Sequence, residues 1–160
     1  MTIKKQEKIM KFNFNMLKYC YNIVNMRFIN FQKHDVALLR RSASTVLEVE
    51  KIKRYQINFV MVSNERIKKL NTKYRKVKRV TDVISFLIDQ KMFIGDIYIS
   101  KRYSQKQAKI YRNTWKKELA YLVIHGVLHL CGYTDYDEIS RAKMFAKQDK
   151  IFKRLFSHVR

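Results

Sequence analysis

The chain has 160 residues, of which 47% are hydrophobic, so it is long enough for one domain with a sizeable core and too apolar for a disordered polymer. Lysine and arginine number 35 against 13 acidic residues, and the net charge of +22 predicts a polyanionic partner, because a genomic bias toward A-rich codons would raise glutamate too. Two cysteines exclude a disulfide framework, and nothing resembles a signal peptide or a membrane span, so we expect one cytoplasmic domain over residues 1–160 without membrane contact.

The first fifty residues predict a helix, a strand and a second helix. Residues 5–26 look weakly helical, and residues 28–31 are a candidate for a short strand. Asp35 is expected to cap a helix that runs to about Lys51, because apolar side chains recur along one side of that segment.

The middle of the chain predicts three strands and a basic loop. Three segments are dense in the β-branched and aromatic residues typical of strands: 56–63 (QINFVMVS), 81–88 (TDVISFLI) and 94–100 (IGDIYIS). After the first of them, Ser63 or Asn64 is expected to cap a short helix over residues 65–74. A loop rich in positive charge follows this helix, at Lys73, Arg75, Lys76, Lys78 and Arg79.

Three helices are expected in the last third of the chain, over residues 101–112, 115–131 and 138–156. The first of them is basic, and Asn113 or Thr114 is expected to cap the second. Gly132 is expected to end the second helix, because glycine adopts the left-handed conformation at a helix C-terminus without a steric penalty. Strands and helices joined by short connections predict an α+β fold.

Residues 125–135, HGVLHLCGYTD, carry the pattern that points to chemistry. His125 and His129 are four residues apart, so a helix places both imidazoles on one face, where a single tetrahedral metal ion can bind both. Gly132 turns the chain, and Asp135 stands where extended zinc-hydrolase motifs carry their third ligand. Three protein ligands leave a position for a water molecule that the metal acidifies. His125, His129 and Asp135 are therefore the predicted ligands of one Zn²⁺ ion.

Gly126 argues against a zinc peptidase. Such an enzyme carries a glutamate directly after the first histidine as its general base, and here that position has no side chain. We expect the glycine to open space beside the metal for a bulky substrate.

The segment HGVLHLCGY resembles the motif HGxLHLxGYDH of the YbeY family of bacterial endoribonucleases that mature ribosomal RNA. Four further segments resemble blocks of the same family in the same order: LNTKYRKVKRVTDVISF (70–86), GDIYIS (95–100), KELAYLVIHG (117–126) and MFAKQ (144–148). The resemblance covers about residues 56–152.

The resemblance implies a zinc-dependent endoribonuclease that is specific for single strands and acts in 16S rRNA 3′-end maturation and 70S ribosome quality control. It implies RNA and the ribosome as partners, with ribosomal proteins possible, and an α+β fold with a mixed sheet of about four strands against the metal helix. His125 and His129 match the first two zinc ligands, and Arg75 matches a functionally important arginine of the cleft, so Arg75 and His125 are the expected catalytic residues. Four positions match residues that line or support the cleft, namely Thr81, Asp82, Ser85 and Phe86.

The third ligand departs from the family pattern. The family has a histidine there, and the direct alignment places Asp135 at that position, after Thr134 where the family has aspartate. If Thr134 is an insertion, Tyr136 aligns with the histidine instead, and Asp137 is a further candidate close by. A carboxylate is an ordinary zinc ligand, which favours Asp135.

Several neighbours have two interpretations. Asp82 orients a ligand histidine or accepts a backbone hydrogen bond at its strand start, and Ser85 lines the cleft or is an ordinary strand hydroxyl. Glu118 either supports the ligands from nearly the same helical face or, as we expect, faces solvent, and Cys131 either competes for the metal or, as we expect, is a small buried residue. The two histidines outside the motif, His34 and His158, are expected to have no role in the site.

Tyr74, Tyr103 and Tyr111 stand among the basic residues and either stack on unpaired bases or belong to the core. The competing function is a non-catalytic assembly factor that binds ribosomal RNA or the ribosome and whose metal site is weak or structural.

Overall fold

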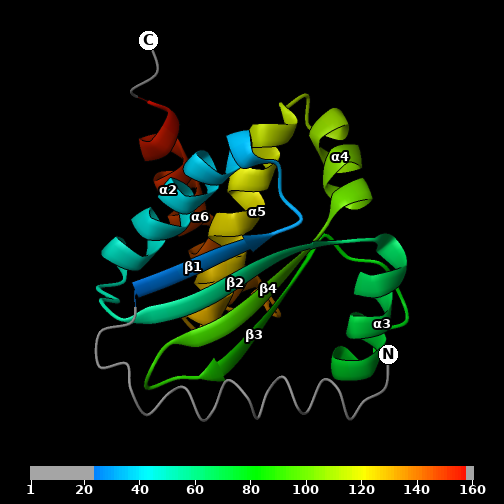
Figure 1. The fold of residues 1–160 in the computed structure, drawn as a ribbon, viewed down its shortest axis with the longest axis horizontal. Coiled ribbons are helices and arrows are strands. Elements are labelled where there is room, and N and C mark those ends of the chain that lie inside the picture. Colours follow the sequence, from blue (N-terminus) through cyan, green and yellow to red (C-terminus); the bar gives the residue numbers. More distant parts are fainter. Residues whose placement is uncertain (1–23, 158–160) are drawn as a thin grey trace.

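The computed structural model describes residues 24–157 and contains one four-stranded sheet with five helices (Figure 1). The strands are β1 (Val24–Ile29), β2 (Tyr55–Val62), β3 (Val83–Asp89) and β4 (Ile94–Ser100), in the order β1-β2-β4-β3. Strands β1, β2 and β4 run parallel, and β3 pairs with β4 in the antiparallel sense, from Val83 opposite Ile99 to Asp89 opposite Ile94. The mixed sheet of four strands in an α+β fold is therefore confirmed.

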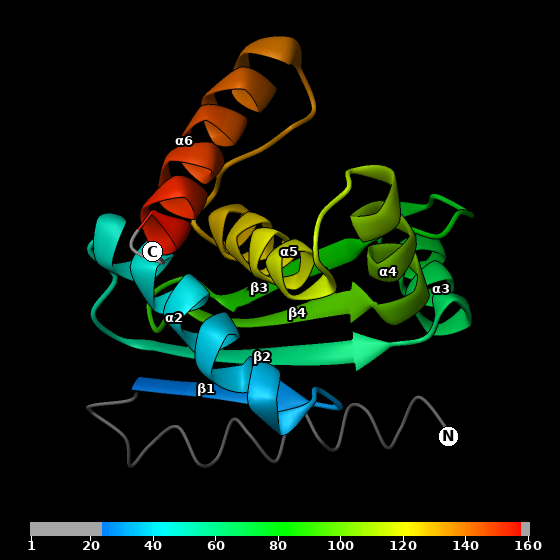
Figure 2. The ribbon, with the colours of Figure 1, turned by 90° about the horizontal axis from the view of Figure 1, so that it is seen from above.

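The helices are α2 (Lys33–Val49), α3 (Asn64–Arg75), α4 (Lys101–Ile110), α5 (Trp115–Leu130) and α6 (Glu138–Phe156). Figure 2 shows α5 lying across one face of the sheet, with α2 and α6 on the same side. Alternate residues of β4, Ile97 and Ile99, are fully buried in the core that contains α5. Tyr98, which lies between them, points to the opposite face, where it packs in a second cluster with Ile67 and Leu70 of α3.

Helix α5 is central because its sequence is apolar on most of its circumference. Ten of its residues are buried, among them Leu119, Ile124 and Leu128 at 0% exposure. Each such side chain contributes about 1.5–3 kcal/mol by leaving water. The sheet, α2 and α6 pack around α5, so its two histidines project from a helix that the core holds in place.

Most predicted element boundaries are confirmed within two residues. Ser63 and Thr114 are the N-caps of α3 and α5, where their side chains accept hydrogen bonds from the backbone nitrogens of Arg66 and Lys117. Two predictions were wrong. The first strand begins at Val24 instead of residue 28, and Asp35 does not cap α2.

Asp35 lies inside the first turn of α2, 1% exposed, and Gln32 is the N-cap. One Asp35 carboxylate oxygen lies 3.3 Å from the His34 ring and 3.8 Å from the Lys116 ammonium, so the side chain contacts basic groups instead of capping the helix backbone. Most of the predicted helix over residues 5–26 lies outside the described residues, and its last three residues belong to β1. Within residues 24–157, every helix is too short or too polar to traverse a bilayer.

Candidate metal centre

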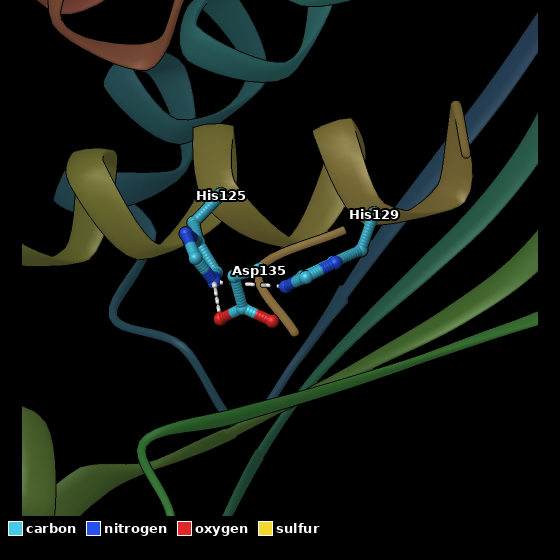
Figure 3. A group of neighbouring side chains, drawn as sticks. All are labelled: His125, His129 and Asp135. Carbon is cyan, nitrogen blue, oxygen red and sulfur yellow. Dashed lines mark hydrogen bonds and ion pairs between the residues drawn. The ribbon is translucent and has the colours of Figure 1, made fainter. Parts of the chain in front are cut away.

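The last turn of α5 and the bend after it bring three candidate ligands together (Figure 3). The Gly132 nitrogen donates to the His129 carbonyl and the Tyr133 nitrogen donates to the Leu128 carbonyl, a Schellman arrangement that requires the left-handed φ of +90° found at Gly132. The chain bends after this glycine, and Asp135 lies beside the two histidines (Figure 3). The predicted helix end at Gly132 is confirmed.

The three side chains meet within the reach of one ion. The Nε2 atoms of His125 and His129 are 2.9 Å apart, and an Asp135 carboxylate oxygen is 4.0 Å from the His125 Nε2. One ligand atom from each of the three residues lies within 4.8 Å of the others. All three residues are partly exposed, so the group is accessible from the surface.

Hydrogen bonds on the far side of each ring fix the imidazole tautomers. The Nδ1 of His125 is 3.0 Å from the side-chain oxygen of Gln148, whose amide nitrogen donates to the Tyr121 carbonyl. The Nδ1 of His129 is 2.9 Å from the Tyr133 carbonyl oxygen. Both partners accept, so each Nδ1 carries the proton and each Nε2 presents a lone pair to the shared space.

This donor set fits a divalent metal ion. Two Nε2 lone pairs at 2.9 Å repel each other as neutral groups, and a carboxylate beside them adds negative charge. A cation among them satisfies all three, and two imidazoles with one carboxylate form a known set of ligands for zinc. Burial, followed by the repulsion that His125 would exert if both rings were protonated, lowers the pKa of His129 and so favours the neutral ring that binds metal.

Asp135 is the third candidate ligand that the fold delivers. Tyr136 is 76% exposed and projects from the bend, while Asp137 is the N-cap of α6 and accepts from the Ser140 nitrogen at 2.9 Å. The hydrogen bonds from Ser140 lower the pKa of Asp137, which is occupied as a cap. The direct alignment of the motif is thus the one that matches the geometry.

Gly126 has a different role from the expected one. It is buried, and a Cβ there would lie 2.8 Å from the Ile97 Cγ2 atom and 3.2 Å from the Ser85 hydroxyl. The glycine therefore lets α5 approach β3 and β4 closely, and it opens no space beside the ligands. A peptidase-type glutamate has no room at this position, which strengthens the argument against that mechanism.

Arg75, at the end of α3, lines the same cleft as the three candidate ligands. The cleft has a volume of about 450 Å³, and its walls include Thr81, Asp82, Ser85 and Phe86, the four positions expected to line or support it. Arg75 is exposed, so its guanidinium is free to contact a ligand that enters. The positive charge of Arg75 also contributes to the lowered pKa of His129.

Asp82 and Ser85 act through the backbone and their neighbours. The Asp82 carboxylate accepts from the Val83 nitrogen at 2.8 Å and from the Gln107 amide at 3.1 Å, which matches the strand-start interpretation and not a bond to a histidine. The Ser85 hydroxyl donates to the Gly126 carbonyl at 2.9 Å. Ser85 therefore ties β3 to the middle of α5, between the two histidines.

Three further expectations have mixed outcomes. Glu118 was expected to face solvent and is 4% exposed, and burial raises the pKa of its carboxyl. Cys131 is partly buried against the core, and burial raises the pKa of its thiol to about 12, so it is a poor competitor for metal. His34 is exposed and remote from the site, and His158 lies outside the described residues.

Two partners of the histidines were missed as functional residues by reasoning from spacing. Gln148 is fully buried on α6, and Tyr133 contributes a backbone carbonyl, which carries no sequence signal. The segment 144–148 already resembled a family block, and the bond from Gln148 to His125 gives that block a physical purpose. Lys147 beside it contacts both the Tyr133 hydroxyl and the Glu50 carboxylate, which anchors the bend to α2.

Known proteins with similar sequences and folds share one family. The family model described as Endoribonuclease YbeY matches residues 24–156. Proteins named Endoribonuclease YbeY include one from Endomicrobium trichonymphae, 67% identical over 84% of this chain and 94% of its own length, and one from Finegoldia magna, 40% identical over 63% and 69%. The solution structure of TM1509 from Thermotoga maritima has a TM-score of 0.58 and 32% identity, covering 83% of this chain and 90% of that one. The chain therefore belongs to the Endoribonuclease YbeY family.

Proposed function

We propose that this protein is a zinc-dependent endoribonuclease specific for single-stranded RNA, and that it acts in 16S rRNA 3′-end maturation and 70S ribosome quality control in the cytoplasm. The single observation that carries the proposal is the pair of Nε2 lone pairs of His125 and His129, with Asp135 beside them, in one cleft with Arg75. The relatives named as endoribonucleases support the reaction class. The span of the family match supports one domain as the working unit.

The proposed ligands are His125, His129 and Asp135. A zinc ion held there supplies a Lewis acid that lowers the pKa of water and neutralises negative charge on a phosphate. Gln148 and the Tyr133 carbonyl hold the two imidazoles in the orientation that exposes Nε2. His125, which lines the cleft, is the proposed catalytic histidine through this role as a ligand.

Arg75 is the proposed phosphate-binding residue. A guanidinium can form two parallel hydrogen bonds to a phosphate, and such a fork stabilises the charge that develops on the oxygens when the phosphodiester bond breaks. Its exposed position at the end of α3 leaves the fork unobstructed. The adjacent charges of residues 73–79 and of α4 attract the rest of the RNA backbone.

The non-catalytic assembly factor remains the second candidate because Asp135 replaces the family's third histidine. A carboxylate has a smaller preference for zinc over other divalent ions than an imidazole has, so the substitution bears directly on which metal is retained. Under this second function the protein binds ribosomal RNA without cutting it.

One comparison separates the two functions. Wild-type protein and His129→Ala are purified in parallel, their bound metal is measured by mass spectrometry, and each is incubated with a labelled single-stranded RNA and its duplex. We expect about one zinc ion per wild-type chain and cleavage of the single strand only, with both properties lost in the variant. His34→Ala is the matched control, since that exposed histidine lies outside the cleft. RNA binding without metal-dependent cleavage would establish the assembly factor instead.

A further inference from the structure

A second groove begins where the metal cleft ends. It has a volume of about 560 Å³ and shares Asp82, His125 and Asp135 with the cleft, so the two form one continuous depression past the candidate ligands. We call it the aromatic groove and define it by six of its lining residues, Gln107, Tyr111, Glu118, Tyr121, Phe145 and Phe152. The volume is in the range of small-molecule sites.

The two ends of this depression have opposite charge. Next to Arg75, a cavity of about 390 Å³ shares Arg75, Thr81 and Tyr136 with the cleft and adds Arg79 to its lining. The aromatic groove is lined by four carboxylates, of which Asp82 and Asp135 are shared with the cleft and Glu118 and Asp149 belong to the far side alone. In the described part of a chain with 35 lysines and arginines, none of the basic residues lines this groove. A phosphate is attracted to the first end and repelled from the second.

Flat rings are available in the aromatic groove. Tyr111 is 67% exposed at the end of α4, and Phe145 is 37% exposed on α6. The Phe145 ring centroid is 6.1 Å from that of His125, so this ring borders the candidate metal centre directly. Tyr121 and Phe152 pack edge to face at 5.5 Å and form the groove's apolar wall.

The polar atoms of the groove are mainly acceptors. The Gln107 side-chain oxygen is buried and has no hydrogen-bond donor among residues 24–157, while its amide nitrogen is used by Asp82. The Glu118 carboxyl is 4% exposed and adds further acceptor oxygens, although it already accepts a hydrogen bond from the Asn113 side chain, which also lines the groove. An acceptor-lined, aromatic groove complements a planar group that carries N–H donors.

We propose that the aromatic groove binds an unpaired nucleobase with an exocyclic amino group, next to the phosphate that is cleaved. The proposal rests on the proposed function and specifies how the RNA strand lies. Its backbone follows Arg75 and Arg79 on one side of the metal centre, and a base stacks on Tyr111 and Phe145 on the other. The arrangement requires a single strand, because the base must leave its stack and its pairing partner to enter.

The test measures affinity, and zinc content is checked separately. A hexanucleotide with a fully 2′-O-methylated backbone is titrated against wild-type protein, with each base removed in turn to give an abasic site. We expect one position where removal of the base weakens binding about fivefold or more, as loss of one stacked base does. At that position, cytosine is expected to bind about fivefold more tightly than uracil, because only cytosine offers an amino donor to the groove.

The variants are Tyr111→Ala and Phe145→Ala, with Ile110→Ala and Ile139→Ala as matched controls. The two isoleucines are 61% and 83% exposed on the same two helices and lie outside the groove. In the aromatic variants the intact hexanucleotide is expected to bind as weakly as the abasic one binds the wild type, with zinc content and melting temperature unchanged. The controls are expected to bind like the wild type.

Failure of the groove and failure of the proposed function give different results. A wild type that neither binds nor cuts single-stranded RNA overturns the proposed function. If the wild type binds and cuts single-stranded RNA, two results overturn the groove proposal alone. One is that base removal weakens binding to the aromatic variants as much as binding to the wild type. The other is that uracil binds as tightly as cytosine. If hexalysine binds the wild type and loses affinity in the aromatic variants while the RNA does not, the groove takes a basic protein segment and the proposal is wrong.

Discussion

Gln148 provides the sharpest test of how the histidines are held. It is fully buried, its side-chain oxygen accepts from the His125 Nδ1 at 3.0 Å, and its amide nitrogen donates to the Tyr121 carbonyl at 3.2 Å. Gln148→Met keeps the volume and removes both hydrogen bonds. Loss of such an orienting partner lowers metal affinity about 10- to 100-fold. Each buried group left unpaired costs about 1–3 kcal/mol of folding free energy.

Gln148→Glu separates the two effects. The glutamate still accepts from the His125 Nδ1 and makes the ring a stronger ligand, but it cannot donate to the Tyr121 carbonyl. We expect zinc affinity, measured by competition with a chromophoric chelator, to fall in the methionine variant and to be retained in the glutamate variant. Melting temperature is expected to fall in both. Equal zinc affinity of wild type and Gln148→Met would refute the orienting role.

Three further predictions concern packing, protonation and phosphate binding. Gly126→Ala is expected to lose about 1–3 kcal/mol of stability by chemical denaturation, because its Cβ would lie 2.8 Å from the Ile97 Cγ2 atom, and the same substitution should cost less in an Ile97→Ala background, where that atom is absent. The metal-free protein is expected to lose stability as pH falls below about 6.5, because the lowered pKa of His129 in the folded state leaves the unfolded state with more bound protons there. Stability measured by calorimetry over a pH series should fall less in His129→Gln, and an equal fall in both proteins would contradict the prediction. Arg75→Ala is expected to lower kcat about 100-fold in a single-strand cleavage assay with zinc content unchanged, and a change in KM alone would assign Arg75 to substrate binding only.

Local sequence signals anticipated most of the fold because they act over a few residues. The strand at Ile94–Ser100 and the helix at Glu138–Phe156 have the predicted bounds, since a run of β-branched residues and a capping Asp137 each act locally. Asp35 misled the prediction because aspartate is both a common cap and a common partner of basic side chains. Its contact Lys116 lies 81 positions further along the chain, in another helix, and no local pattern reports it.

The three candidate ligands could be predicted from the sequence because one helix and one turn position them. His125, His129 and Asp135 follow from spacing alone, because a helical turn and a left-handed glycine fix their relative positions. The buried position of Glu118 and the packing of Gly126 were not predictable. Both depend on how closely α5 lies against the sheet, which long-range packing decides.

The two walls of the cleft differ in the sequence separation of the residues that form them. The three candidate ligands fall within eleven consecutive residues, whereas Arg75 is 50 residues upstream of His125 and reaches the cleft only after α3 has docked on β3 and β4. Closing a short loop costs less entropy than closing a long one, so the wall with the three candidate ligands depends less on the rest of the fold than the wall with Arg75 does. Substitutions in the cluster that packs α3 on the sheet, for example at Ile67 or Ile84, should therefore yield chains that retain zinc but no longer bind RNA. In such chains metal content ceases to be a proxy for a competent enzyme, and a screen that scores metallation alone will count inactive protein as intact.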